Sequence, residues 1–250
     1  PQPVVAGEYG GPTLLGFPAV APVMQRVMAD ALAGGGPSLD SADLAAADDE
    51  TPDRKAMRTL YYRMADLPPE LQMFMQGCPP ALEAKRHRIA CREVVTRTLL
   101  LLAEDVDVTC YWNLAPEVPN YRDRFNLMGF LSDKLALMDF VHSDLKRREP
   151  AADSFDRLAA HLSDAQAVRR VESQPGIVAI AVEKPSGAEV VLWREADAFD
   201  GEDEPPELCD WPWPAPSARV IDVFGMSREI STTEGRLNIC VSVTPVFIVP

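Results

Sequence analysis

The feature that most constrains the fold of this chain is a change of pattern near residue 163. Before it, two short apolar stretches, at 4–6 and 106–113, are separated and followed by helical patterns. After it, apolar residues alternate with polar ones, as they do along 236–243. Such a period of two is typical of strands with one buried face. The sequence therefore predicts an α/β region over residues 1–163 and an all-β domain over residues 164–250.

The spacing of the first region favours parallel strands joined by helical crossovers. Apolar residues at three- and four-residue intervals predict helices at about 18–33, 52–64, 81–104, 127–138 and 152–162. In the second region, strands are expected at 177–182, 189–193, 218–224 and 236–243, forming an antiparallel β-sandwich. A long loop is expected over 197–216, in which Trp211 and Trp213 cover a sheet edge, with stacking on a carbohydrate as the alternative.

Composition excludes several classes of partner. The chain has 38 acidic against 24 basic residues and a net charge of −14, which disfavours nucleic acid and anionic membranes. No apolar run approaches the ~20 residues of a membrane span. The chain has five cysteines, an odd number, and none of them form a CxxC pair. Neither a disulfide framework nor a zinc site is therefore expected. Localisation stays open, with cytoplasmic favoured over secreted.

The chemistry-bearing residues lie where the two apolar stretches of the first region end. In (β/α)8 barrels, catalytic groups stand at the carboxyl ends of the strands. Glu8 and Tyr9 occupy one such end, and Trp112 and Asn113 occupy the other, with Glu117 as a weaker candidate further along the loop. A carboxylate flanked by aromatic rings suits sugar chemistry. The same residues are equally consistent with structural roles, Glu8 as the partner of a helix dipole and Trp112 as an aromatic residue of the core.

Three segments carry a resemblance to a known group of enzymes. Residues 4–12, VVAGEYGGP, resemble the seventh-strand nucleophile segment of retaining glycoside hydrolases of the (β/α)8 clan that uses two glutamates. Residues 110–114, CYWNL, resemble the eighth-strand segment of these enzymes. The tail from 220 to 248 resembles the small β-domain that follows the barrel in families related to β-xylosidases.

This resemblance implies a fold and a set of roles. The first region would be the C-terminal segment of a TIM barrel, holding strands 7 and 8. Glu8 would be the nucleophile, Trp112 would stack under the sugar, and Tyr9 and Asn113 would form hydrogen bonds around it. No cofactor and no metal are implied, and His87 and Cys91, four residues apart, lack further ligands at compatible spacing.

Size then limits what the chain can do alone. A complete barrel takes ~250 residues, more than the first region, residues 1–163, provides. The family's acid/base glutamate follows an asparagine, and this sequence contains no Asn-Glu pair. We therefore expect a fragment of a glycosidase without turnover of its own. Its partners would be a carbohydrate substrate and the missing N-terminal barrel units. The alternative is a non-catalytic carbohydrate-binding or scaffold protein derived from such an enzyme. A barrel remnant should also expose strand edges and associate.

Overall fold

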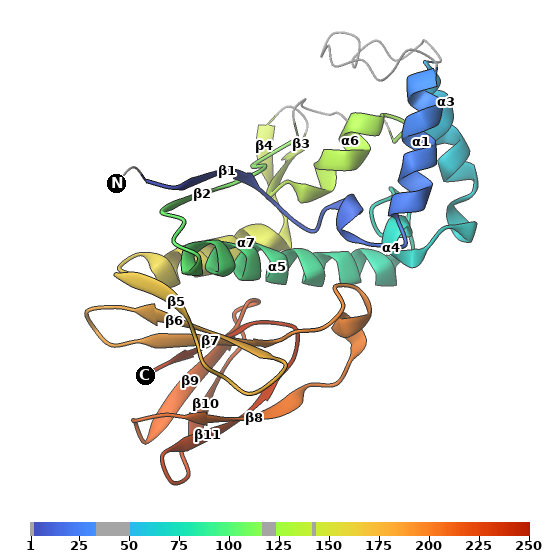
Figure 1. Cartoon of the computed structure of the whole chain (residues 1–250). Helices are drawn as coiled ribbons and strands as arrows, with labels where there is room; N and C mark the ends of the chain where they lie inside the picture. The colour runs from blue at the N-terminus through green and yellow to red at the C-terminus, as the bar shows by residue number, and fades with distance from the viewer. Residues whose placement is uncertain (1–2, 34–50, 117–123, 142–143) are drawn as a thin grey trace. The chain divides into compact units, whose positions relative to one another are not determined.

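Figure 1 shows the computed structural model of the chain, which describes residues 3–33, 51–116, 124–141 and 144–250. The chain divides into two compact units. The β unit comprises Pro1–Gly10, Ile89–Tyr111 and Pro150–Pro250, and the helical unit comprises Gly11–Arg88 and Trp112–Glu149. These units do not follow the expected boundary at residue 163, because the first two strands and the last helix belong with the C-terminal sheets.

The β unit begins with a parallel pair of short strands. β1 (Val5–Tyr9) pairs with β2 (Val108–Tyr111), with Val5 opposite Val108 and Tyr9 opposite Tyr111. The parallel pairing predicted from the spacing is thus confirmed. Among the described residues no third strand joins this pair, so each strand has one open edge.

The C-terminal part of the β unit is antiparallel throughout. Its main sheet has six strands in the order β10-β9-β12-β7-β6-β5, and β8 pairs with β11 in a separate ribbon. Side chains of both sheets meet in one buried cluster, which includes Leu192, Cys209, Val220 and Ile239. The strands are β5 (Ala167–Val171), β6 (Ile177–Glu183), β7 (Glu189–Arg194), β8 (Glu207–Pro212), β9 (Ser217–Asp222), β10 (Ser227–Ser231), β11 (Arg236–Val241) and β12 (Val246–Val249).

The four strands expected in this region are present, but the loop expected over 197–216 is wrong in part. It contains β8, whose buried Cys209 alternates with exposed neighbours. Acidic residues and prolines on both sides hide this short alternation in the sequence. Trp213, just beyond β8, is buried in the core, and its indole Nε1 donates to the carbonyl of Ser217 at 3.0 Å. Trp213 is therefore a core residue of the β unit.

Helices cover part of the main sheet. α7 (Pro150–Leu162) places the His161 ring flat on Phe247 of β12, with ring centroids 4.1 Å apart. Ser154 of the same helix donates to the carbonyl of Val223 at 2.8 Å. The long helix α5 (Pro80–Ala103) begins in the helical unit and continues in the β unit from Ile89, where its apolar side chains are buried.

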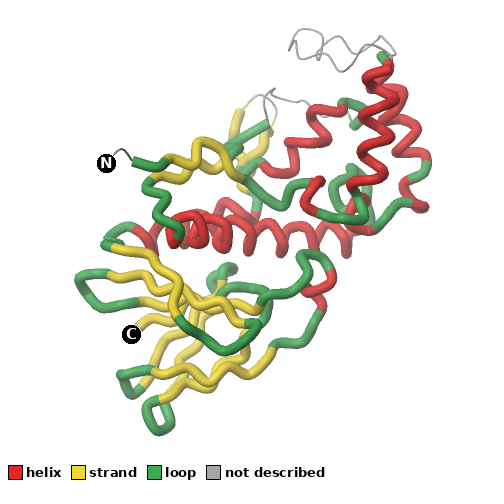
Figure 2. The backbone as a smooth tube through the Cα atoms, viewed as in Figure 1, coloured by secondary structure: helices red, strands yellow, loops and turns green. Residues whose placement is uncertain are grey.

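The helical unit is built around two adjacent helices, α1 (Ala21–Ala33) and α3 (Pro52–Tyr62), shown side by side in Figures 1 and 2. Its shorter elements are η1 (Leu14–Gly16), η2 (Met64–Asp66), α4 (Pro69–Gln72), α6 (Leu127–Ser132) and η3 (Asp133–Leu135). A hairpin of β3 (Met138–Val141) and β4 (Asp144–Arg148) follows. None of the helices in the described ranges has the length and apolarity to cross a bilayer.

The helix expected to run from Leu127 to Met138 is therefore wrong at its C-terminal end. α6 stops at Ser132, and Met138 opens β3, which pairs with β4. The three- and four-residue spacing of the leucines continues past the helix. Pairing with β4, which lies later in the chain, overrides this local pattern.

Candidate functional site

Tyr9 is the best-anchored of the candidate residues, at the end of β1. Its hydroxyl lies 2.5 Å from Oγ1 of Thr98 on α5. Because the Thr98 hydroxyl already donates to the carbonyl of Val94 at 2.6 Å, the Tyr9 hydroxyl is the donor of this bond. Burial raises the pKa of Tyr9, while hydrogen bonds to Thr98 and Thr109 lower it by less. Tyr9 thus fixes β1 to α5.

Glu8 precedes Tyr9 and lies within β1, which extends further than the expected 4–6. The β1–β2 register is irregular between Ala6 and Tyr9. In this stretch the Glu8 side chain is exposed, and within the described ranges its carboxylate has no hydrogen bond or ion pair. Glu8 is therefore accessible to a ligand.

Trp112 and Asn113 follow β2 directly and belong to the helical unit. Trp112 is 36% exposed, so part of its side chain is accessible to a ligand. Asn113 is buried: its Nδ2 donates to the carbonyl of Ala115 at 2.9 Å, and its backbone carbonyl accepts from the amide of Leu137 at 3.1 Å. The side-chain Oδ1 has no hydrogen-bond partner among the described residues. Asn113 therefore orders the turn after β2. The Trp112–Asn113 peptide is cis.

The β1–β2 register relates these four candidates to one another. Tyr9 is opposite Tyr111, and their rings meet edge to face with centroids 5.5 Å apart. Trp112 is the residue after Tyr111, as Glu8 is the residue before Tyr9. The structure brings Tyr9 and Tyr111 into contact, and the candidates Glu8 and Trp112 are their neighbours in the sequence. Glu117 lies outside the described residues.

A cluster of charges around Glu83 has no obvious catalytic role. The Glu83 carboxylate binds Arg86 at 2.8 Å and Lys134 at 3.0 Å, with His87 at 3.4 Å. Burial raises the pKa of Glu83, but these hydrogen bonds and charges outweigh it and hold the pKa far below the ordinary range. The Cys78 thiol, whose pKa is raised by burial and by Glu83, is a poor nucleophile. Glu83 remains ionised and acts as a structural anchor.

In the part of the chain that the structure describes, no group of three or more His, Cys, Asp or Glu side chains is arranged to hold an ion. His87 lies near the carboxylates of Glu83 and Glu149, at 3.4 and 3.8 Å, whereas Cys91 is buried.

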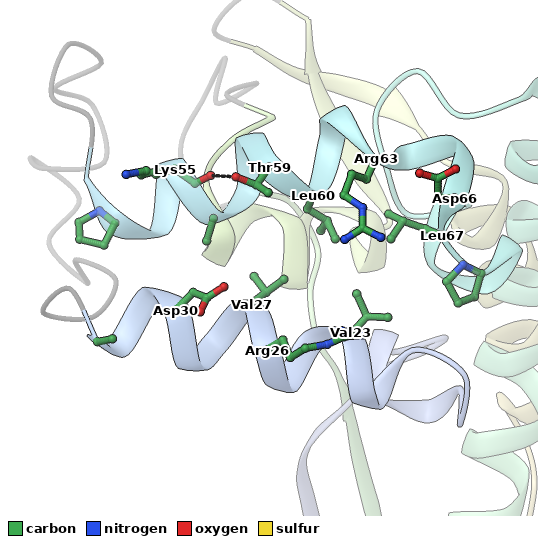
Figure 3. Close-up of a pocket in the computed structure, with 14 residues that line it drawn as sticks. Val23, Arg26, Val27, Asp30, Lys55, Thr59, Leu60, Arg63, Asp66 and Leu67 are labelled. Atoms are coloured by element: carbon green, nitrogen blue, oxygen red, sulfur yellow. Dashed lines mark hydrogen bonds between the residues drawn. The ribbon is translucent and has the colours of Figure 1, made fainter.

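A groove between α1 and α3 is a further candidate site, which the sequence reasoning missed (Figure 3). It encloses about 910 Å³, and its floor is apolar while its rims carry charged side chains. A signal for it was present in the sequence, since Val23 and Val27 share a helix face with Arg26. The lining comprises Val23, Arg26, Val27, Asp30, Ala33, Pro52, Lys55, Ala56, Thr59, Leu60, Arg63, Asp66, Leu67 and Pro68.

Comparisons with known proteins give only partial likenesses. No family model matches the sequence, and the search of curated proteins finds no match. Among solved structures, the chain is similar to a family 39 glycoside hydrolase from the gut symbiont Bacteroides cellulosilyticus WH2, with a TM-score of 0.42 and 14% identity. This likeness covers 64% of the chain and 30% of that protein.

Two further structures show likenesses of similar extent. An α-amylase from Anoxybacillus gives a TM-score of 0.37 at 8% identity, covering 67% of this chain and 33% of the other. AmyP in complex with maltose gives 0.37 at 13% identity, covering 67% and 35%. The chain thus spans about a third of the length of these structures.

Proposed function

We propose that this chain is part of a retaining glycoside hydrolase and that Glu8 is the nucleophile. The observation that carries the proposal is the parallel pairing of β1 with β2, in which Tyr9 is opposite Tyr111. In parallel β/α sheets, catalytic groups stand where neighbouring strands end. Glu8 and Trp112 each adjoin one member of this tyrosine pair, at the ends of neighbouring strands.

The chemistry follows from the exposed carboxylate. The Glu8 carboxylate would attack the anomeric carbon and form a glycosyl ester, while the bond from that carbon to the leaving oxygen breaks. Trp112 would cover the apolar face of the sugar ring. The leaving oxygen needs a proton from a second carboxyl group ~5–5.5 Å from the nucleophile. The proposal assigns that acid to the rest of the enzyme.

The test uses 2-deoxy-2-fluoro glycosides that carry fluoride or dinitrophenolate as leaving group. These groups depart without protonation, so labelling reports the nucleophile independently of the acid. The reagent panel is applied to this chain and to any longer protein that contains it, followed by mass spectrometry of the intact protein and of its peptides. We expect one fluoroglycosyl group, attached to Glu8.

Two variants make this test specific. Glu8→Gln keeps the shape of the side chain and should abolish labelling, whereas Glu104→Gln, an exposed glutamate after α5, should leave it unchanged. Labelling at another carboxylate, or undiminished labelling of Glu8→Gln, would refute the assignment. An active longer protein that the reagents inactivate without modifying Glu8 would refute it equally.

A second function, non-catalytic carbohydrate binding, is favoured by a different observation. Trp112 offers an exposed ring, while Glu8 has no carboxyl partner in hydrogen-bond contact among the described residues. Such a protein would retain glycans on an affinity column, and Trp112→Ala would abolish retention. No fluoroglycosyl label would form on Glu8. Retention together with labelling of Glu8 favours the hydrolase.

A further inference from the structure

The groove between α1 and α3 has an apolar floor that is suited to bind a hydrocarbon chain. α1 and α3 lie side by side, and residues 23–33 of one and 52–63 of the other line the groove. At 1.5 Å per residue, this lining extends for roughly 15 Å. Val27 and Leu60 are buried and form its floor together with the smaller Ala56. An unbranched chain of ten or so carbons is of comparable length.

Two arginines from different elements flank the groove, and Asp66 lies beside one of them, Arg63 (Figure 3). Arg26 projects from α1, and Arg63 follows α3 (Figure 3). The Arg26 guanidinium makes only a 3.3 Å bond from Nε to the carbonyl of Pro22, one turn earlier in the chain. Within the described residues, neither arginine has a carboxylate partner. Both guanidinium groups are therefore available to an anion.

The other charged groups on the lining are Lys55, Asp30 and Asp66. Three cations against two acids leave this groove slightly positive, although the whole chain carries −14. A cationic ligand would meet both arginines as it entered, so an anion is the better match. Guanidinium groups bind carboxylate and phosphate oxygens with charge-assisted hydrogen bonds.

We propose that the α1–α3 groove binds a single-chain amphiphile whose anionic head lies between Arg26 and Arg63 and whose tail lies over Val27 and Leu60. The volume of about 910 Å³ is within the range of small-molecule sites. Alkyl carboxylates and alkyl phosphates share the required chemistry. This site is independent of Glu8 and of the proposed glycosidase function.

Calorimetric titration of the chain with decanoate, decyl phosphate and decanol, each below the concentration at which it forms micelles, tests the proposal. We expect both anions to bind at least about tenfold more tightly than decanol, because only they engage the arginines. The ratio between decanoate and decyl phosphate identifies the preferred head group. Replacing both arginines, Arg26→Gln with Arg63→Gln, should reduce both anions to the affinity of decanol.

A matched control removes two exposed arginines elsewhere, Arg219→Gln with Arg228→Gln, and should leave binding unchanged. Ala56→Phe fills the floor without changing charge and should abolish binding of all three compounds. Circular dichroism and thermal melting verify that each variant is folded. The proposal fails if decanol binds as tightly as decanoate, or if the control loses as much affinity as the groove variant.

A second copy of the chain is the competing occupant. Sedimentation would then show a dimer that Arg26→Gln with Arg63→Gln dissociates and that decanoate leaves intact. That result would overturn the proposal. A dimer that decanoate dissociates through the same arginines would instead support it.

Discussion

At the scale of single residues, Glu189 links the end of α7 to the main sheet. Its carboxylate meets His161 Nδ1 and Lys184 Nζ, each at 2.6 Å. Burial raises the pKa of Glu189, but the hydrogen bonds from His161 and Lys184 prevail and lower it below the ordinary value. In the unfolded chain the same carboxyl protonates near its usual pKa of about 4.3. The interaction therefore stabilises the fold above that pH and is lost as the pH falls through the lower, folded-state value.

We predict that Glu189→Gln lowers the melting temperature at pH 7 and that this deficit shrinks as the pH is reduced towards 3. Thermal melts of both proteins across this range measure it. Glu183→Gln is the matched control, because its pair with Arg169 is exposed and should contribute little at any pH. A deficit of the same size at every pH would show that Glu189 acts through packing alone.

The sequence could identify the candidate site residues but not what holds them. Glu8 and Trp112 stand out because they are a carboxylate and an indole at the ends of apolar stretches. The anchoring of Tyr9 by Thr98 was not predictable, since the two are 89 residues apart and are brought together only by the packing of β1 against α5. Asn113 was expected to meet a sugar, yet its amide is bound to Ala115 two residues on.

At the scale of elements, a buried ion pair joins α5 to the turn η4 (Asp200–Asp203) of the β unit. Arg92 lies 2.5 Å from Glu202 and also donates to the carbonyl of Ala198. Their side chains are 4% and 3% exposed, so neither charge is solvated by water once its partner is removed. Breaking such a pair from one side is expected to cost about 3–5 kcal/mol.

We predict that Arg92→Met destabilises the chain by about this amount, and that Arg92→Met with Glu202→Leu recovers much of the loss because neither charge of the pair then stays buried. Denaturant unfolding of the two single variants and the double variant gives the coupling energy. Arg97→Met is the control on the same helix, since its pair with Glu93 is partly exposed and should be worth less than about 1 kcal/mol. An additive double variant would contradict the predicted coupling.

Elements with a clear internal period could be predicted, and those defined by a distant partner could not. The helical spacing of apolar residues in α1 and the alternation of β11 both appear in the structure close to where they are expected. β8 and β3 are among the strands that were missed, because each is stabilised by its pairing strand. The α1–α3 groove was missed because it depends on two helices that are separated in sequence.

At the scale of the whole molecule, two features have opposite effects on self-association: the open edges of β1 and β2 promote it, and the net charge opposes it. Val5 and Val108, which pair with each other, are 53% and 46% exposed, and each strand presents an unpaired edge in the described part of the chain. Exposed apolar edges promote pairing with another copy. The charge of −14 opposes close approach, and added salt screens this repulsion.

We therefore predict that self-association at neutral pH increases with NaCl, as the screening length falls from about 10 Å at 0.1 M to about 3 Å at 1 M. Sedimentation velocity at several salt concentrations measures it. Val5→Lys with Val108→Lys should suppress the association, because charged edge residues block strand pairing. Leu208→Lys with Met226→Lys adds the same charge to exposed positions on other strands and turns, so it should suppress association less. If the chain sediments as a monomer at every salt concentration, the prediction is wrong. The β1 and β2 edges then do not drive association, and charge repulsion is not what keeps the chains apart.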